Sequence, residues 1–330
     1  MKLLFIGGTG VISTASSRLA VEQGLELYVL NRGQSTRLLP AGAHQLRGDI
    51  RDLASAQAAL GDLRFDVVVN WVAFLPEHIE SDLRLFQGRT SQYIFISSAS
   101  AYQTPPASLP VTEATPLENP YWDYARNKIA CEERLRRAHR EEKFPMTIVR
   151  PSHTYDPSYI PLRGRYTAID RLRRGQKVIV PGDGTSLWVL THNRDFAKGI
   201  LGLFGNARAI GEAYHITSDE LLTWNQIYEA LARAAGAEPH LVHIPSELIM
   251  AYDPIWGAGL LGDKANSMIF DNTKIKRAVP GFAATTPFSL GAQEIIAWHD
   301  ADPSRCTVDE GFNQLTEQIL AAYEKAWPGH

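Results

Sequence analysis

Residues 2–13 of the chain read Lys2-Leu3-Leu4-Phe5-Ile6-Gly7-Gly8-Thr9-Gly10-Val11-Ile12-Ser13. A short apolar run ends at Ile6, and glycine then occupies three of the next four positions. After these glycines, apolar residues recur with helical spacing, at Val11, Ala15 and Leu19. The pattern predicts a strand, a tight turn and the start of a helix. In such a unit the backbone N–H groups and the helix dipole can meet a pyrophosphate.

Three positions of this turn have separate roles in the interpretation. Gly7 allows the tight turn, and Gly10 lets the backbone approach the phosphates. The third position of the spacing is usually glycine and here is Ser13, which is small enough to keep the helix packed on the strand. The alternatives are an ordinary glycine turn and a signal peptide, but the apolar stretch is too short for the latter.

The first half of the chain continues with alternating strands and helices. Apolar runs predict strands at 25–30, 65–70, 93–97 and 146–150, with helices near 52–60, 77–88 and 122–142. This alternation predicts a parallel sheet covered on both faces, whose ligands bind beyond the carboxyl ends of the strands. The residues expected at those ends are Gly7, Asn31, Asn70, Ser98 and Pro151.

The composition is that of a cytoplasmic protein with one large or two modest domains. The chain has 330 residues and a formal net charge of −3, which gives no general attraction to nucleic acid or membranes. No apolar stretch is long enough to span a bilayer. The two cysteines, Cys131 and Cys306, are too few for a disulfide framework, and no Cys/His cluster has zinc spacing. We therefore expect no metal site and no membrane partner.

A candidate catalytic group follows the strand that ends near Ser97. Ser98 lies just beyond that strand, and Tyr124 and Lys128 are spaced i and i+4 on an expected helix, so both project from one face. A lysine ammonium beside a phenol stabilises the phenolate, which should lower the pKa of Tyr124 from about 10 toward working pH. Ser98 would hold the substrate oxygen. The alternative interpretation is an exposed pair on a helix surface.

Taken together, these motifs resemble the extended short-chain dehydrogenase/reductases, the NAD(P)-dependent epimerase/dehydratase superfamily. The resemblance covers about residues 2–300 and rests on an ordered set of motifs: Gly7–Ile12, Gly48-Asp49-Ile50-Arg51-Asp52, Ser97-Ser98, Tyr124 with Lys128, Arg150-Pro151, Pro181-Gly182-Asp183-Gly184-Thr185 and Asp195-Phe196-Ala197. It implies a Rossmann-type doubly wound parallel α/β sheet with a smaller mixed C-terminal substrate domain. We expect the cofactor domain over 1–155 and the substrate region over 156–330, with 190–218 returning to the sheet.

The resemblance also implies roles for individual residues. Ser98, Tyr124 and Lys128 would be catalytic. Asp49 and Ile50 would flank the adenine. The remaining cofactor-binding positions would be Gly7, Thr9, Gly10, Val11, Ile12, Asn31, Arg32, Ala73, Phe74 and Pro151, together with Tyr124 and Lys128.

The end of the second strand bears on which cofactor is used. Members that prefer NAD commonly carry an acidic residue there, which binds the ribose 2′-hydroxyl. This chain has Asn31-Arg32-Gly33, with nothing to repel a 2′-phosphate, and Arg32 can pair with one through charged hydrogen bonds. We therefore expect NADP to be preferred and NAD to be possible. In the competing interpretation Arg32 only stacks on adenine, which suits NAD equally.

Departures from the family pattern narrow the range of expected substrates and reactions. Sugar 4,6-dehydratases carry an Asp-Glu pair where this chain has Ala99 and Ser100, so 4,6-dehydration is not expected. A diphosphate-binding arginine of the nucleotide-sugar epimerases is replaced by Trp188, which argues against a nucleotide-diphospho substrate. An arginine at another position could bind the diphosphate instead. The candidates for this are Arg163, Arg165 and Arg171.

Three residues are candidate substrate contacts. His153 lies just past a strand end, where it can bind substrate, move a proton or simply hold a loop. Tyr155 and Trp188 are expected as pocket walls.

The resulting prediction is an NAD(P)-dependent oxidoreductase or epimerase acting on a hydroxyl or carbonyl carbon of a sugar-like or small carbonyl substrate. One alternative is a nucleotide-sugar epimerase with retained NAD. Another, from the resemblance of His192–Asp195 and Phe270–Asn272 to chloroplast stem-loop-binding proteins, is RNA binding, which the acidic balance disfavours. A redox-sensing regulator is a further alternative. The resemblance also implies a homodimer formed through helices 77–88 and 122–142.

Overall fold

The computed structural model describes residues 1–326 and contains a seven-stranded sheet in which every neighbouring pair is parallel. The strand order is β11-β6-β5-β4-β1-β2-β3. Its strands are β1 (Lys2–Ile6), β2 (Glu26–Asn31), β3 (His44–Arg47), β4 (Phe65–Asn70), β5 (Thr90–Ile96), β6 (Met146–Pro151) and β11 (Ala213–Ile216). The central strands are buried on both faces, as parallel strands between helices require. The predicted fold class is confirmed.

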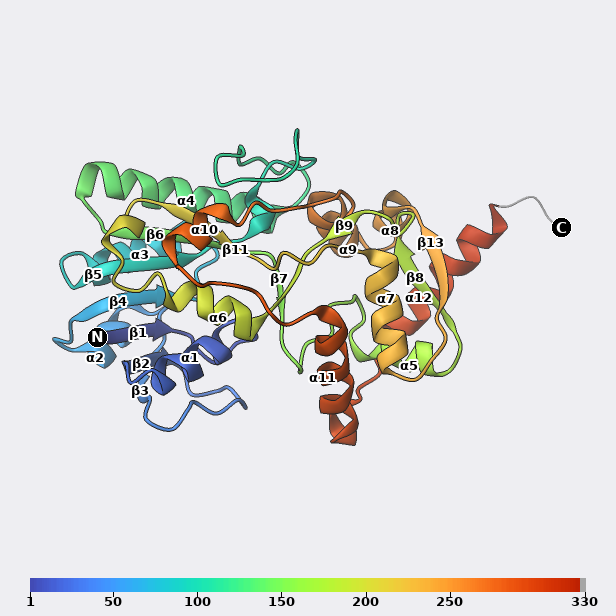
Figure 1. Cartoon of the computed structure of the whole chain (residues 1–330), viewed down its shortest axis with the longest axis horizontal. Coiled ribbons are helices and arrows are strands. Elements are labelled where there is room, and N and C mark those ends of the chain that lie inside the picture. The colour runs from blue at the N-terminus through green and yellow to red at the C-terminus, as the bar shows by residue number, and fades with distance from the viewer. Residues whose placement is uncertain (327–330) are drawn as a thin grey trace.

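Helices cover both faces of this sheet. Residues of α2 (Leu53–Leu60), α3 (Pro76–Phe86) and α4 (Asp123–Glu142) belong to one apolar core, and residues of α1 (Ser13–Glu22) and α6 (Asn193–Leu201) belong to the other. Figure 1 shows this lobe at the left, with α4 along its upper side and α1 below. Local chemistry sets the helix starts: the Asp52 side chain accepts hydrogen bonds at the start of α2, and Pro76 occupies the first turn of α3.

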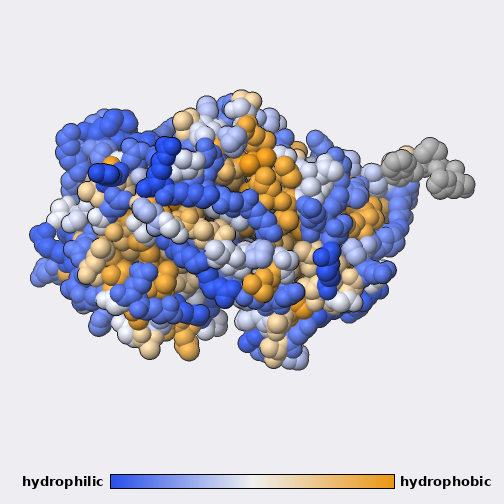
Figure 2. Space-filling view, viewed as in Figure 1, coloured by the Kyte–Doolittle hydropathy of each residue, from blue (hydrophilic) through white to orange (hydrophobic). Residues whose placement is uncertain are grey.

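The second lobe is built largely from the chain after residue 152. Three two-stranded ladders pair β7 (His153–Tyr155) with β10 (Leu190–His192), β8 (Lys177–Pro181) with β13 (His240–Ile244), and β9 (Leu187–Trp188) with β12 (Leu222–Thr223). Its helices are α5 (Tyr166–Arg173), α7 (Trp224–Ala234), α8 (Ser246–Tyr252), α9 (Pro254–Gly259), α11 (Phe288–Asp300) and α12 (Glu310–Lys325), and α10 (Thr273–Ala278) lies against β11. Figure 2 shows apolar side chains gathered near the middle of one face, where the two lobes meet, and hydrophilic side chains toward the outer ends.

An ion pair joins the two lobes beside the first glycine turn. The loop between β2 and β3 carries Arg37, whose Nη1 donates to Asp156 Oδ2 at 2.7 Å. The same nitrogen lies 3.5 Å from Thr14 Oγ1, in the first turn of α1. The Arg37 side chain therefore links the start of α1 to the loop that carries Asp156 in the second lobe.

None of the helices within residues 1–326 has the length and apolarity needed to cross a membrane.

Candidate active site at the carboxyl edge of the sheet

The glycine turn after β1 has the backbone shape that a dinucleotide site needs. Gly7 and Gly8 have φ values of 99° and 109°, which only glycine adopts without strain. A Cβ on Gly8 would lie 3.1 Å from Val29 Cγ1, whereas a Cβ on Gly10 would meet only Ser13 Oγ at 3.4 Å. The start of a helix is a favourable place for an anion, and α1 begins directly beside this open position, with the Thr14 N–H bonded to the Gly10 carbonyl at 3.0 Å. The turn fits a pyrophosphate.

Ser13, the departure from the usual glycine, closes the turn with its side chain. Its Oγ accepts a hydrogen bond from the Gly10 N–H at 2.9 Å, and the residue is 2% exposed. One turn later, Ser17 Oγ donates to the Gly8 carbonyl at 2.8 Å. The helix therefore stays packed against the strand without the third glycine.

The carboxyl end of β2 forms a basic edge. Asn31 Oδ1 accepts from the Gly33 N–H at 2.9 Å and so shapes the turn, while Arg32 is exposed beyond it. Strand β3 places Arg47 opposite Asn31, and the Arg47 side chain lies beside Gly33. Sequence reasoning missed Arg47 because β3 is short and three of its four residues are exposed, so no alternation marked the strand. Asp49 and Ile50 follow, with Ile50 buried.

The loop after β4 is held by a buried amide. Asn70 Oδ1 accepts from the N–H groups of Val72 and Ala73, both at 2.8 Å, and Asn70 Nδ2 donates to Asp82 on α3. Asp82 also accepts the Tyr93 hydroxyl, and its other carboxylate oxygen has no partner within residues 1–326. Burial raises the pKa of Asp82 to about 7. Asp82 thus supports the loop that the sequence analysis assigned to the cofactor channel.

This raised pKa predicts a pH dependence of stability. The native pKa of about 7 exceeds the unfolded value of about 3.9, so between them the native state binds more protons, and Asp82 makes stability fall as pH rises. The free energy of unfolding should fall by about 1.4 kcal/mol per pH unit in this range, and the dependence should disappear above about pH 7. Asp82→Asn should remove this contribution. Urea unfolding at pH 5 and pH 7.5 would measure it against the exposed control Asp62→Asn. Equal pH dependence in Asp82→Asn and the parent would contradict it.

The candidate catalytic residues meet at the carboxyl ends of β4 and β5. Tyr124 lies in the first turn of α4, with its ring centre 6.3 Å from that of Phe74 and 4.8 Å from that of Trp122. Ser98 precedes the short helix η1 (Ala99–Ala101), and its Oγ lies 2.7 Å from Ser100 Oγ. The structure therefore brings Ser98, Tyr124 and the cofactor-channel residue Phe74 together.

The phenol of Tyr124 is not activated as expected from the lysine alone. Burial raises the pKa of Tyr124 to about 12, and a hydrogen bond with Ser98 opposes this only in part. Lys128 Nζ instead donates to the carbonyls of Ala73 and Ile96, at 2.7 and 2.8 Å, and lies 5.7 Å from the centre of the Tyr124 ring. Burial lowers the pKa of Lys128 to about 7, so its positive charge is only partly present at neutral pH. The expected lowering of the Tyr124 pKa is therefore not seen in this structure.

A buried ion pair locks α4 to the sheet behind these residues. Glu132 lies one turn after Lys128, and its carboxylate accepts from Arg150 Nε at 2.9 Å and Nη2 at 2.6 Å. Glu132 Oε1 also accepts the Ser97 hydroxyl at 2.6 Å. Both charged side chains are almost completely buried, at 0% and 1% exposure. This pair fixes the helix that carries Tyr124 against the strand end that carries Ser98.

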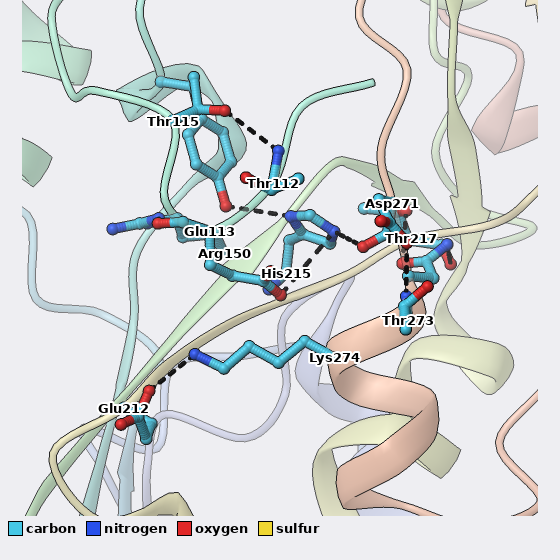
Figure 3. A network of polar contacts seen from close by, with 12 residues as sticks. Thr112, Glu113, Thr115, Arg150, Glu212, His215, Thr217, Asp271, Thr273 and Lys274 are labelled. Carbon is cyan, nitrogen blue, oxygen red and sulfur yellow. Dashed lines mark hydrogen bonds and ion pairs between the residues drawn. The ribbon is translucent and has the colours of Figure 1, made fainter. Parts of the chain in front are cut away.

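The polar network continues to the edge strand β11. His215 Nδ1 lies 3.0 Å from the Tyr102 hydroxyl, and its Nε2 lies 2.8 Å from the Asp271 carbonyl oxygen. Figure 3 shows the His215 ring facing Asp271 on one side, with Glu113 and Arg150 close to it. The Arg150 guanidinium lies 4.7 Å from the centre of the Tyr102 ring, so the network reaches the ion pair of α4.

A pocket of about 860 Å³ opens into the second lobe. It starts at Trp122, beside Tyr124, and is lined by aromatic and charged side chains that include His153, Tyr159, Arg163, Arg165, Trp224, Trp256 and Lys264. Arg163 is paired with Asp253 at 2.7 Å. Arg171 lies outside this pocket, where it is buried and bonded to Glu317 and Asn313. Arg165 and Lys264 are the pocket's other basic residues.

The three expected substrate residues have different positions. His153 lines the pocket, and its Nδ1 accepts from Trp188 Nε1 at 3.3 Å. Trp188 is 4% exposed and stacks on Trp224, so it supports the wall from behind. Tyr155 is completely buried, against Phe288 and His192, and does not line the pocket. The prediction for Tyr155 mistook a core residue for a wall, because an apolar strand has the same pattern in either place.

Within the described part of the chain, no group of three or more His, Cys, Asp or Glu side chains is placed to hold a metal ion.

The model of the NAD dependent epimerase/dehydratase family matches residues 3–217. The chain belongs to this family. The match covers the sheet, the glycine turn and the residues from Ser98 to Lys128. Among solved structures of the same fold, UDP-glucose 4-epimerase from Bifidobacterium longum, in complex with NAD⁺ and UDP, superposes with a TM-score of 0.75 at 19% identity, over 92% of this chain and all of that one.

Two curated relatives indicate how varied the family is. The chain is 28% identical over 257 residues to the chloroplast stem-loop binding protein of 41 kDa b of Arabidopsis thaliana, which covers 73% of this chain. The match spans only 65% of that relative's own length. It is 27% identical over 260 residues to 2-alkyl-3-oxoalkanoate reductase of Stenotrophomonas maltophilia, over 72% of this chain and 76% of that one.

Proposed function

We propose that the protein is an NAD(P)-dependent oxidoreductase or epimerase that acts on a hydroxyl or carbonyl carbon of a sugar-like or small carbonyl substrate. The observation that carries this proposal is the grouping of Ser98, Tyr124 and Lys128 at the carboxyl edge of the sheet, where Tyr124 contacts the pocket residue Trp122. The family match and the fold of structures bound to NAD support it.

The cofactor would occupy the carboxyl edge of the sheet. The glycine turn and the start of α1 would hold the pyrophosphate, Asp49 and Ile50 would flank the adenine, and Ala73 and Phe74 would border the channel. Lys128, whose Nζ donates to the Ala73 carbonyl, would border the same channel. When bound, the nicotinamide supplies a hydride donor or acceptor and, in its oxidised form, a positive charge.

The chain's own residues would orient the substrate oxygen and move its proton. Ser98 would donate a hydrogen bond to that oxygen and hold it beside Tyr124. Tyr124 would exchange a proton with the same oxygen as hydride leaves or reaches the attached carbon. Positive charge near the phenol would bring the raised pKa of Tyr124 down, and Lys128, whose Nζ lies 5.7 Å from the centre of the Tyr124 ring, is the candidate to provide it. The aromatic pocket walls would exclude water.

We propose that NADP is the preferred cofactor, with Arg32 and Arg47 binding its 2′-phosphate at the basic edge. Losing one charged hydrogen bond costs about 1.5–3 kcal/mol, which corresponds to roughly 10–100-fold in affinity. Arg32→Ala should therefore weaken NADPH by that factor while leaving NADH within about twofold. Fluorescence titration of the purified protein with both nucleotides measures this. Arg18→Ala, an exposed change on α1, is the control.

The same preparation tests the wider proposal. Denaturing the purified protein and analysing the released nucleotide distinguishes a dissociable NADP, expected of a reductase, from a retained NAD, expected of an epimerase. Equal loss of NADH and NADPH affinity in Arg32→Ala would show that the arginine stacks on adenine. A protein that binds neither nucleotide would contradict the proposed function.

A further inference from the structure

A continuous row of aromatic rings and cations runs from Tyr124 into the pocket. The ring of Trp122 lies 4.8 Å from that of Tyr124, and Lys264 Nζ lies 5.3 Å from the centre of the Trp122 ring. On its other side, Lys264 lies 5.5 Å from the centre of Trp188. Trp188 bonds His153, and the His153 ring lies 6.0 Å from that of Tyr159. The row ends where the Arg165 guanidinium stacks on Tyr159 at 3.6 Å.

Lys264 is a half-buried cation in this row, with a side chain that is 23% exposed. Two indole rings flank its ammonium, and its carboxylate partner is Asp263, at 2.8 Å. The backbone carbonyl of Lys264 accepts the Trp224 indole N–H at 3.1 Å, so the residue is anchored from its main chain. A lysine ammonium has three donors, and Asp263 takes one of them.

Arg165 keeps its place in the pocket despite an unfavourable backbone. It has φ 53° and ψ −124°, and the Thr167 N–H bonds the Gly164 carbonyl at 3.0 Å, which makes Arg165 the second residue of a tight turn. That turn position favours glycine. The guanidinium donates to the Ile160 carbonyl at 2.8 Å, and its other donors have no acceptor anywhere in residues 1–326. Strain of this kind marks candidate functional positions.

His153 adds a neutral donor between the two cations. Trp188 can only donate, so His153 Nδ1 accepts, and the neutral ring carries its proton on Nε2. Burial lowers the pKa of His153 well below its usual range, and the charges of Lys264 and Arg165 lower it further. Both cations line the same pocket as His153. The nearby carboxylates already have partners. Asp263 forms an ion pair with Lys264, Asp253 forms one with Arg163, and Asp309 accepts a hydrogen bond from the first turn of α12.

We propose that this pocket binds a polyhydroxylated substrate that carries one carboxylate or phosphate group, with Arg165 and Lys264 binding that anion and the His153 N–H completing its contacts. The proposal rests on the function proposed above and names the substrate class of the same site. Donors outnumber free acceptors along the row, which suits an anion. Trp122 and Trp256 also line the pocket, and indole rings provide apolar surface that suits the C–H faces of a sugar ring.

Calorimetric titration of the NADP-saturated protein tests this with four probes: D-glucuronate, D-glucose 6-phosphate, D-glucose and UDP. At least one of the two sugar anions should bind about tenfold more tightly than glucose, or tighter still. The anion that binds more tightly shows whether the site takes a carboxylate or a phosphate. Arg165→Met and Lys264→Met should each weaken that anion by a similar factor and leave glucose unchanged. Arg174→Met, at the other end of α5, should bind as the parent does.

Arg165→Gly separates binding from folding. Glycine accepts the φ of 53°, so this variant should melt no lower than the parent and still lose the anion. Three outcomes would overturn the proposal. Glucose could bind as tightly as both anions, neither anion could bind, or the affinity for the anion could be unchanged in both Arg165→Met and Lys264→Met. UDP binding more tightly than both sugar anions, and weakened in both variants, would overturn the single-anion class in favour of a diphosphate. Because no step requires turnover, failure here is distinct from failure of hydride transfer.

Discussion

Tyr124→Phe should lower kcat by about 10²–10⁴-fold, the usual contribution of a positioned proton-transfer group. The replacement removes only the hydroxyl that is bonded with Ser98 and keeps the ring against Trp122 and Phe74. Nucleotide affinity and thermal stability should stay close to those of the parent. Steady-state assays with any substrate found by screening aldehydes, keto-sugars and sugar acids would measure the loss.

A matched control exists three residues earlier on the chain. Tyr121 is 43% exposed, so Tyr121→Phe should leave kcat unchanged. If Tyr124→Phe kept normal turnover with intact nucleotide binding, the proton-transfer role would be wrong and another acid would have to serve. The raised pKa of Tyr124 makes a rate that rises with pH the expected profile, since the ionised phenol is the base in the oxidative direction.

Glu132→Gln should lower the free energy of unfolding by about 3–5 kcal/mol, the cost of leaving a buried charge without its partner. Arg150 is 1% exposed, and the amide nitrogen of glutamine would face its guanidinium donors. Ser97 would compete for the one remaining oxygen. Urea unfolding followed by tryptophan fluorescence would give the midpoint and slope for each variant.

Two further variants show whether the ion pair itself is responsible. Glu133→Gln changes the neighbouring exposed carboxylate and should be neutral. The double change Glu132→Leu with Arg150→Met removes both charges and should recover most of the lost stability, because buried pairs can be replaced by apolar side chains of similar size. A loss as large in the double variant as in Glu132→Gln would indicate that the shape of this region matters, and not the isolated charge.

The sequence predicted those parts of the fold that local patterns determine. Strand β1, the glycine turn and α1 follow from an apolar run, three glycines and helical spacing, and the main sheet follows from the alternation after them. The i, i+4 spacing of Tyr124 and Lys128 placed both on one helix, as the structure has them. Short edge elements had no such signal, and β3, with three exposed residues of four, was missed.

Tertiary contacts decided the parts of the site that the sequence did not reveal. Lys128 was expected to act on Tyr124, but two carbonyls from β5 and the β4 loop hold its ammonium. Arg165 and Lys264 share no motif and lie about a hundred residues apart, so only the folded pocket brings them to His153. Tyr155 has the same apolar context as a pocket residue and differs only in what packs on it.

The two parts of the site come from separate stretches of the chain. The glycine turn, Ser98, Tyr124 and Lys128 precede residue 130, whereas the pocket residues proposed to bind an anion, His153, Arg165 and Lys264, come after residue 150. The contacts that join them include the pair of Arg37 with Asp156 and an apolar core in which Tyr102 packs with residues of the second lobe. Mutations that change which molecule the pocket binds can therefore accumulate in the second lobe without altering the residues proposed for hydride transfer in the first. That separation gives one physical route by which relatives with the same sheet could diverge toward different molecules.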